Sequence, residues 1–292
     1  MIKVLYYAMP VLALLILLSP TMNTSVYAHT FSGDESASFL TKIEMIKIES
    51  KLALEQVSNN TEIAKEHAEH AANQLTSNDT EEITERNSRL AAELNNALNN
   101  FSNAFESETP SQTDISDRVT SINDIIADVV NSRIDEEQQE NATVKALVVN
   151  DLVGETLEDY GVALGMEEGE HESEHAENVT STEHSTESSS NETSSIIDEE
   201  SYQTAQATIT RAIEKFDEIK EDSENSTELG DSLNAVKEKI DNKAPFDEID
   251  TIVDGKITPL LNSVYDLNLT EEEGEEHAEG EGEEHAEGEE NT

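Results

Sequence analysis

The chain has 292 residues, of which 66 are Asp or Glu and only 17 are Lys or Arg, so its formal net charge is −49. With aromatic residues at 4%, this charge excludes one large, densely packed globule, because self-repulsion opposes compaction. It also excludes nucleic acid as an expected partner, since phosphate binding needs clustered Lys and Arg, and it favours cationic partners such as metal ions.

Residues 1–28 are typical of a secretory signal peptide. Lys3 supplies the positive end, Val11 to Leu18 form a short apolar core, and Ala28 ends a small-residue cleavage site. The apolar core is too short to cross a bilayer of about 30 Å as a helix. We therefore expect export with cleavage after Ala28 and no membrane span in the mature chain, the alternative being an uncleaved anchor. Because the chain has no cysteine, its stability must come from helix packing.

Residues 29–166 predict an N-terminal bundle of about five helices, because apolar residues recur there at helical spacing. A third helix is expected to begin near Asp79, where Asp79 and Glu82 have the spacing of a capping box. The predicted helices and their apolar positions are Asp34 to Val57 (Phe39, Ile43, Ile46, Ala53, Val57), Thr61 to Leu75 (Ala64, Ala68, Ala71), Asp79 onward (Ile83, Leu90, Leu94, Leu98), a helix after Pro110 (Ile115, Val119, Ile122, Ile126), and Val144 to Leu164.

Residues 201–269 predict a second, C-terminal unit of three helices, with apolar stripes over Tyr202 to Ile219, Leu229 to Ile240, and the stretch after Pro245. The stretches 167–200 and 270–292 are rich in Glu and contain no Lys or Arg, which predicts a disordered acidic linker and a disordered acidic tail. The fold class expected is all-α: two antiparallel helical bundles joined by this linker. Matching leucine spacings leave open whether the two bundles are duplicated copies.

Histidines among these carboxylates are the candidate metal ligands. Imidazole and carboxylate groups bind zinc, copper and iron, and the motif GEEHAEG occurs twice in the tail. His29 would become the first residue after cleavage, where its imidazole and the free amino group could chelate copper(II). The alternative interpretation is that the acidic runs are solvated spacers and that His29 only follows the cleavage site. The candidates are His29, His67, His70, His171, His175, His277 and His285.

His67 and His70 lie three residues apart in a predicted helix, so both project from the same side of it. Carboxylates from a facing helix would complete a metal site with this pair. However, neither an HExxH motif nor a Glu three residues before either histidine is present. The alternative is that both histidines flank the buried stripe without binding an ion.

Eight asparagines after the predicted signal peptide begin the N-x-S/T motif of N-glycosylation. Since Asn, Ser and Thr are abundant, about half of these motifs are expected by chance, and glycosylation is an expectation only for an archaeal or eukaryotic exported protein. The candidates are Asn59, Asn78, Asn100, Asn141, Asn178, Asn191, Asn225 and Asn268.

No motif of an enzyme stands out. The sequence has no Gly-rich phosphate loop, no G-x-S-x-G elbow and no cysteine nucleophile, and its acidic pairs are too numerous for one to be singled out as catalytic. We expect an exported, non-enzymatic helical binding protein that collects or buffers copper or iron, with zinc as a further candidate ion. The alternative is a structural or adhesive acidic envelope protein acting through protein–protein contacts.

Seven stretches carry a resemblance: 28–31, 35–37, 66–75, 85–94, 141–165, 201–212 and 241–261. Together they resemble an uncharacterised family of exported all-helical proteins of ammonia-oxidising archaea. This resemblance implies export and a helical fold, and it implies no activity. A fainter similarity links 202–261 to the extracytoplasmic helical segment of iron-transporter permeases, whose Arg-Glu-Gly-Leu-Glu-type motifs the chain lacks.

Overall fold

The computed structural model describes residues 32–107, 109–166, 194–221 and 223–267, which all belong to one compact unit. Every regular element in these ranges is a helix, and none of them is a strand, so the predicted all-α class is confirmed. No helix in the described ranges combines the length and the apolar character that crossing a membrane requires. The predicted signal peptide 1–28 and the predicted tail 270–292 lie outside the described residues.

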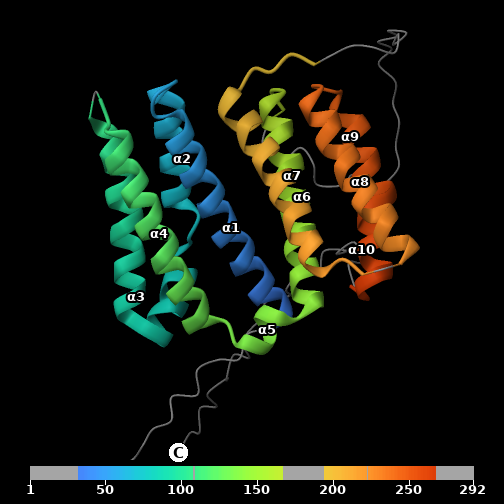
Figure 1. Ribbon diagram of the computed structural model, residues 1–292, viewed down its shortest axis with the longest axis horizontal. Coiled ribbons are helices and arrows are strands. Elements are labelled where there is room, and N and C mark those ends of the chain that lie inside the picture. The colour runs from blue at the N-terminus through green and yellow to red at the C-terminus, as the bar shows by residue number, and fades with distance from the viewer. Residues whose placement is uncertain (1–31, 108, 167–193, 222, 268–292) are drawn as a thin grey trace, which may run out of the picture. The chain divides into compact units, whose positions relative to one another are not determined.

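The first four long helices pack around one apolar core (Figure 1). They are α1 (Gly33–Gln56), α2 (Thr61–Asn73), α3 (Ser77–Asn103), which continues into the 3₁₀ turn η1 (Ala104–Glu106), and α4 (Gln112–Arg133). This core contains the apolar stripes predicted from the helical spacing. Its largest fully buried side chains include Phe39, Ile43, Ile83, Leu94, Phe101, Ile115 and Ile122.

Capping side chains fix where these helices begin. Ser32 and Glu35 form a reciprocal capping box at the start of α1. At the start of α3 the box joins Thr76 to Asp79, so the predicted pairing of Asp79 with Glu82 is wrong. Thr76 has the hydroxyl that an N-cap needs, whereas Glu82 lies one turn further on and pairs with the buried Arg133.

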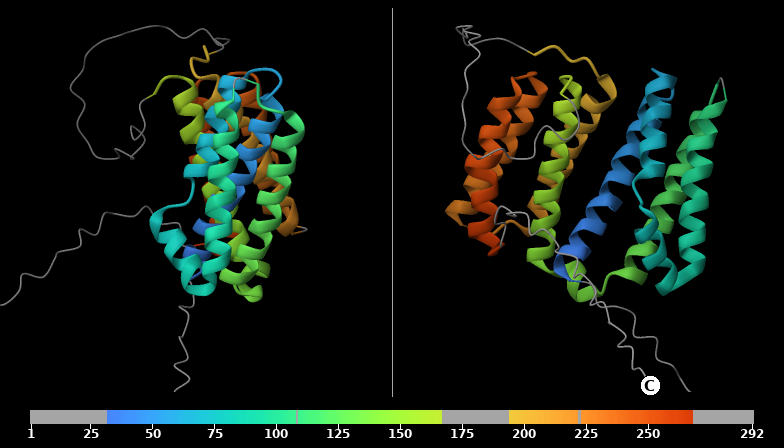
Figure 2. Two further views of the ribbon diagram at one scale, coloured as in Figure 1. Left: turned by 90° about the vertical axis from the view of Figure 1, so that its left-hand side faces the viewer. Right: turned by 180° about the vertical axis from the view of Figure 1, so that it is seen from behind.

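The remaining helices pack around a second core, which Figure 2 shows from the opposite side. They are the short α5 (Glu136–Glu140), α6 (Ala142–Ala163), α7 (Glu199–Ile219), α8 (Glu224–Asp241) and α9 (Phe246–Ile252), then the π-helical turn η2 (Val253–Ile257) and α10 (Thr258–Tyr265). Pro245 directly precedes α9, as its fixed backbone angle predicts for a helix start. The stretch after Pro245 is thus one helical run interrupted by a π turn.

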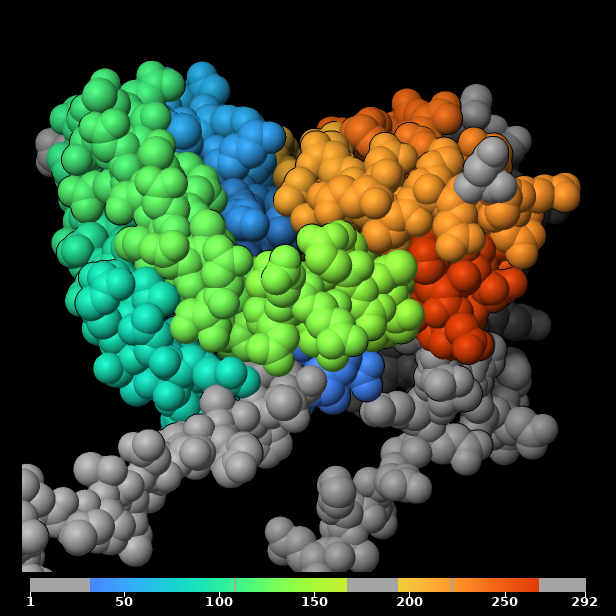
Figure 3. All heavy atoms as spheres, turned by 60° about the horizontal axis from the view of Figure 1, so that its bottom comes forward, coloured from blue at the N-terminus to red at the C-terminus, as the bar shows by residue number. Residues whose placement is uncertain are grey.

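Helix α6 belongs to the second core, which corrects the predicted division into 29–166 and 201–269. Its most extensive interface is with α7, and its buried residues share a core with α7 to α10. Figure 3 shows α6 lying between the surface of α4 and that of α10. The division into two separate bundles is wrong because α1 is buried on two faces and so belongs to both cores. Phe39, Ile43 and Ile46 line the first core, while Met45, Ile48 and Leu52 line the second.

Residues 194–198 are held against the helices, so the predicted disordered linker 167–200 ends too late. The amide of Ser194 donates to the carbonyl of Lys243 at 2.7 Å, and the amide of Ile197 donates to that of Ala163 at 2.9 Å. Helix α7 then begins at Glu199, two residues before the predicted start. The part of the predicted linker from 167 to 193 lies outside the described residues.

The Tyr160 hydroxyl links α6 to the turn between α8 and α9. It donates to the carbonyl of Ala244 at 2.6 Å, and the side chain is fully buried. Tyr160→Phe leaves this carbonyl without its donor and should lower the free energy of unfolding by about 1 kcal/mol. Urea denaturation followed by circular dichroism measures this, and Tyr202→Phe, which removes a matching bond to Ile240, should cost a similar amount. An unchanged midpoint for Tyr160→Phe would contradict the packing of α6 with the second core.

Candidate metal centre

Carboxylates and imidazoles gather where α1, α2 and α7 meet. Glu49 lies on α1, His67 and His70 lie on α2, and Glu200 lies in the first turn of α7. Caps position two of these helices. Asn60 accepts from the amides of Glu62 and Ile63 at the start of α2, and Asp198 accepts from the amide of Ser201 at the start of α7. The four side chains therefore project from fixed helix ends and faces into one region.

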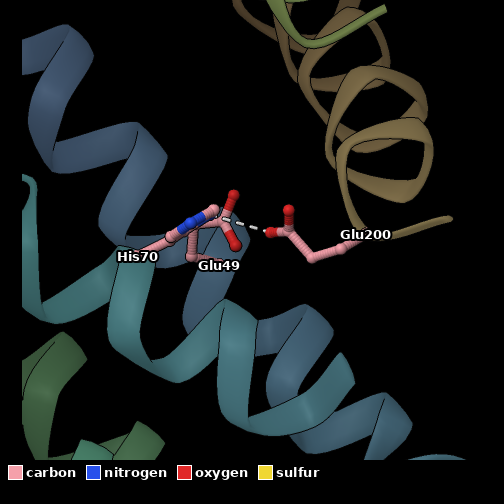
Figure 4. A group of neighbouring side chains, drawn as sticks. All are labelled: Glu49, His70 and Glu200. Carbon is pink, nitrogen blue, oxygen red and sulfur yellow. Dashed lines mark ion pairs between the residues drawn. The ribbon is translucent and has the colours of Figure 1, made fainter. Parts of the chain in front are cut away.

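The distances among the four side chains are short. Nδ1 of His67 lies 2.7 Å from Glu49 Oε2 and 3.1 Å from Glu200 Oε1, and Nδ1 of His70 lies 2.9 Å from Glu200 Oε1. Figure 4 shows His70 and Glu200 facing one another next to Glu49. Ligand atoms of Glu49, His70 and Glu200 all lie within 4.8 Å of one another, a separation that one metal ion could bridge.

Burial is unequal across the site. Glu49 is 1% exposed, His67 is fully buried and Glu200 is 6% exposed, whereas the side chain of His70 is 54% exposed. Glu200 Oε1 is itself buried and accepts no hydrogen bond of normal geometry, although both Nδ1 atoms approach it. The cluster is thus closed on the side of α1 and open to solvent at His70.

A surrounding layer of polar side chains fixes Glu49 and His67. The Thr204 hydroxyl donates to Glu49 Oε1 at 2.9 Å, and Oε1 of Gln203 faces His67 Nε2 at 3.4 Å. Gln203 is held in turn, because the amide of Gln56 donates to the same oxygen at 2.8 Å. Both ring nitrogens of His67 therefore face oxygen acceptors, which suits an imidazolium that donates from each nitrogen.

The pKa values follow from this geometry. Burial lowers the pKa of His67, but its contacts with Glu200 and Glu49 outweigh burial and raise that pKa from 6.5 to about 9. Burial raises the pKa of Glu200, but its contacts with His67 and His70 outweigh burial and lower that pKa from 4.5 to about 2. The pKa of His70 is raised by its contact with Glu200, against the effect of burial. Without a metal, the raised pKa of both histidines and the lowered pKa of Glu200 favour the charged forms of these three groups.

Comparison with protein-family models, with curated proteins and with solved structures found no match.

Of the predicted ligands, the structure brings His67 and His70 together with two carboxylates. The other five, His29, His171, His175, His277 and His285, lie outside the described residues. Sequence reasoning missed Glu49 and Glu200. The available signal was a charged residue next to the buried stripe of α1, since Glu49 falls between Ile46 and Ala53.

Some of the predicted glycosylation motifs lie in the described residues and others do not. Asn178, Asn191 and Asn268 lie outside the described residues, and the other five asparagines are exposed. Asn141 also caps α6, because its Oδ1 accepts from the amide of Thr143 at 2.8 Å. Glycosylation stays a prediction. The other described motifs begin at Asn59, Asn78, Asn100 and Asn225.

Proposed function

We propose that this protein is an exported, non-enzymatic helical binding protein that holds a transition-metal cation at Glu49, His67, His70 and Glu200. The observation that carries the proposal is the convergence of Glu49, His70 and Glu200 within 4.8 Å of one another from three separate helices. His67 contacts both carboxylates from the same helix as His70 and adds a second imidazole.

The donor atoms favour a class of ion. Two imidazole nitrogens with carboxylate oxygens suit zinc, iron, manganese and copper(II), whereas copper(I) prefers sulfur ligands and the chain has no cysteine. A divalent ion with two carboxylates and two neutral imidazoles carries no net charge. Such a neutral set avoids the cost of burying an uncompensated charge, which supports a divalent ion as the cargo.

The solvent-facing side of the site also favours a cation. Glu62, Glu66 and His70 follow one another at intervals of four residues along α2, so they share one face of that helix. Glu62 and Glu66 are exposed, and the pKa of Glu66 is raised by burial and by the charges of Glu200, Asp198 and Glu62. This acidic surface raises the local concentration of cations next to His70. We propose that the ion reaches the buried carboxylates by way of His70.

Titration of the metal-free, full-length protein with Zn²⁺ and with Co²⁺ tests the function. We expect a dissociation constant below about 10 µM, and Co²⁺ should give the absorption bands of a nitrogen- and oxygen-ligated ion. Glu49→Gln should weaken binding at least tenfold, about 1.4 kcal/mol, because it removes a buried carboxylate that pairs with His67 and with no Lys or Arg of the described residues.

Glu44→Gln is the matched control. Glu44 is a buried carboxylate on the same helix, but Arg211 and Lys215 neutralise it at 2.7 and 3.5 Å. Metal affinity should not change in this variant. Binding weaker than about 100 µM, or equal losses for Glu44→Gln and Glu49→Gln, would reject the proposal. The cluster would then be a network of ion pairs between helices, and the structural or adhesive envelope role would be the better explanation.

A further inference from the structure

A threonine in the interface between α1 and α7 contacts the metal centre. The hydroxyl of Thr204 donates to Glu49 Oε1 at 2.9 Å. Thr204 is 2% exposed and Glu49 is 1% exposed, so water does not compete for this hydrogen bond. Breaking the bond would leave a buried carboxylate oxygen without this donor, which costs more than losing a hydrogen bond at the surface.

The two oxygens of Glu49 have different neighbours. Oε1 accepts from Thr204, whereas Oε2 lies 2.7 Å from Nδ1 of His67. An ion that binds a carboxylate through both oxygens must lie close to both of them. The bond from Thr204 holds the carboxylate in the orientation that turns Oε2 toward the histidine. Oε2 is therefore the oxygen available to an ion beside His67.

Gln203, the neighbour of Thr204 on α7, orients His67 in a similar way. The amide nitrogen of Gln203 donates to Glu199 at 3.3 Å, and its oxygen accepts from the Gln56 amide at 2.8 Å. An ionised carboxylate only accepts, so the Gln203 nitrogen must face Glu199 and its oxygen must face His67 Nε2, 3.4 Å away. Nε2 of His67 thus keeps its proton, and Nδ1 is the nitrogen available to an ion.

We propose that Thr204 is a positioning residue of the metal centre, which makes Glu49 bind the ion through Oε2 alone. This inference rests on the proposed function and deepens it. One oxygen from Glu49 and one nitrogen from His67 are single donors, which suits zinc, because zinc sites have few ligands and mix nitrogen with oxygen. Calcium, by contrast, takes more ligands, all of them oxygens, and often both oxygens of a carboxylate. The preferred ion is accordingly Zn²⁺.

Titration of the full-length protein and its Thr204 variants with Zn²⁺ and with Co²⁺ tests this inference. Thr204→Val keeps the shape of the side chain without the hydroxyl. It should bind both ions at least tenfold more weakly, which is the usual effect of removing a group that orients a metal ligand. Its Co²⁺ absorption should also weaken, because a carboxylate that binds through both oxygens raises the coordination number. Thr204→Ser keeps the hydroxyl and should restore both the affinity and the spectrum.

Thr208→Val is the matched control. Thr208 lies one turn further along α7 and is fully buried, but its hydroxyl contacts Met45 Sδ at 3.7 Å and not the cluster. This variant should keep the affinity and the Co²⁺ spectrum of the wild type. Equal losses for Thr208→Val and Thr204→Val would overturn the inference, because any lost hydroxyl between α1 and α7 would then weaken binding.

The outcomes separate this inference from the proposed function. If the wild type binds neither Zn²⁺ nor Co²⁺, the proposed function fails and this inference fails with it. If the wild type binds both ions and Thr204→Val matches it in affinity and spectrum, the inference is overturned while the metal centre stands. Should circular dichroism show that Thr204→Val does not fold, a crystal of the wild type with Zn²⁺ decides instead. An anomalous zinc peak within coordinating distance of both Glu49 oxygens would overturn the inference, and a peak beside Oε2 alone would support it.

Discussion

Glu200→Gln should lower the free energy of unfolding of the metal-free protein by about 3 kcal/mol near pH 6, because it breaks a buried network of charges. Glu200 is 6% exposed, and its carboxylate lies within 3.1 Å of Nδ1 of both His67 and His70. Glutamine keeps the shape of the side chain but removes the negative charge. His67 and His70 would then have only the Glu49 carboxylate beside them, so the protonated form of each imidazole would be less stable.

Chemical denaturation in the presence of a chelator measures this loss, and Glu199→Gln is the matched control. Glu199 occupies the preceding position in the first turn of α7, but it is exposed. Near the cluster it accepts a hydrogen bond from the Gln203 amide at 3.3 Å, which a glutamine oxygen can also accept. Its replacement should cost less than about 1 kcal/mol, which is the usual effect of one acidic group at a helix start. Equal losses for both variants would show that only the charge near the end of α7 matters, and not the contact with the histidines.

The stability of the metal-free protein should fall as the pH rises from about 6.5 to about 9. The pKa of His67 is raised from 6.5 to about 9, so between these values the folded protein binds a proton that the unfolded chain does not. Stability from this proton is complete below pH 6.5 and lost above pH 9. A shift of this size corresponds to about 3 kcal/mol. The pKa of Glu200, lowered to about 2, gives the opposite sign, so its contribution is present above pH 4.5 and is lost as the pH falls toward 2.

Unfolding free energies at several pH values between 5 and 9, with chelator present, test this dependence. The wild type should be most stable between about pH 5 and pH 6.5. In His67→Gln the decline above pH 6.5 should be much shallower, since the buried group that gains a proton on folding is gone. A decline of the same steepness in both proteins would mean that groups other than His67 cause it.

Most of the helices could be predicted from the sequence, because apolar spacing reports one buried face directly. The stripe of Phe39, Ile43, Ile46 and Ala53 was recognised and lies in the first core. The second buried face of α1 was not recognised, because a helix with two such faces has little overall asymmetry. The prediction that α6 belongs to the N-terminal bundle was wrong for the same reason. Its residues are apolar around much of the helix, and such a pattern does not indicate which neighbour it meets.

The candidate site could be predicted only in part. The spacing of His67 and His70 is local information within one helix, so the pair was predicted to share a face. Glu49 lies 18 residues before His67, and Glu200 lies 133 residues after it. In a chain with 66 acidic residues, the only local signal for either carboxylate is the place of Glu49 next to the buried stripe of α1, and no local pattern distinguishes Glu200 from the other acidic residues. Only the packing of α1 against α7 brings them together.

Helix α1 is shared by both cores, and the cluster lies where the two cores meet. Helix α2 packs in the first core and α7 in the second, so the ligands come from both sides of the seam between them. An ion held there would crosslink that seam and would make its opening less favourable as the free ion concentration rises above the dissociation constant. Binding of the ion would then change how tightly the two layers of helices pack together. A partner could detect this change without contacting the ion.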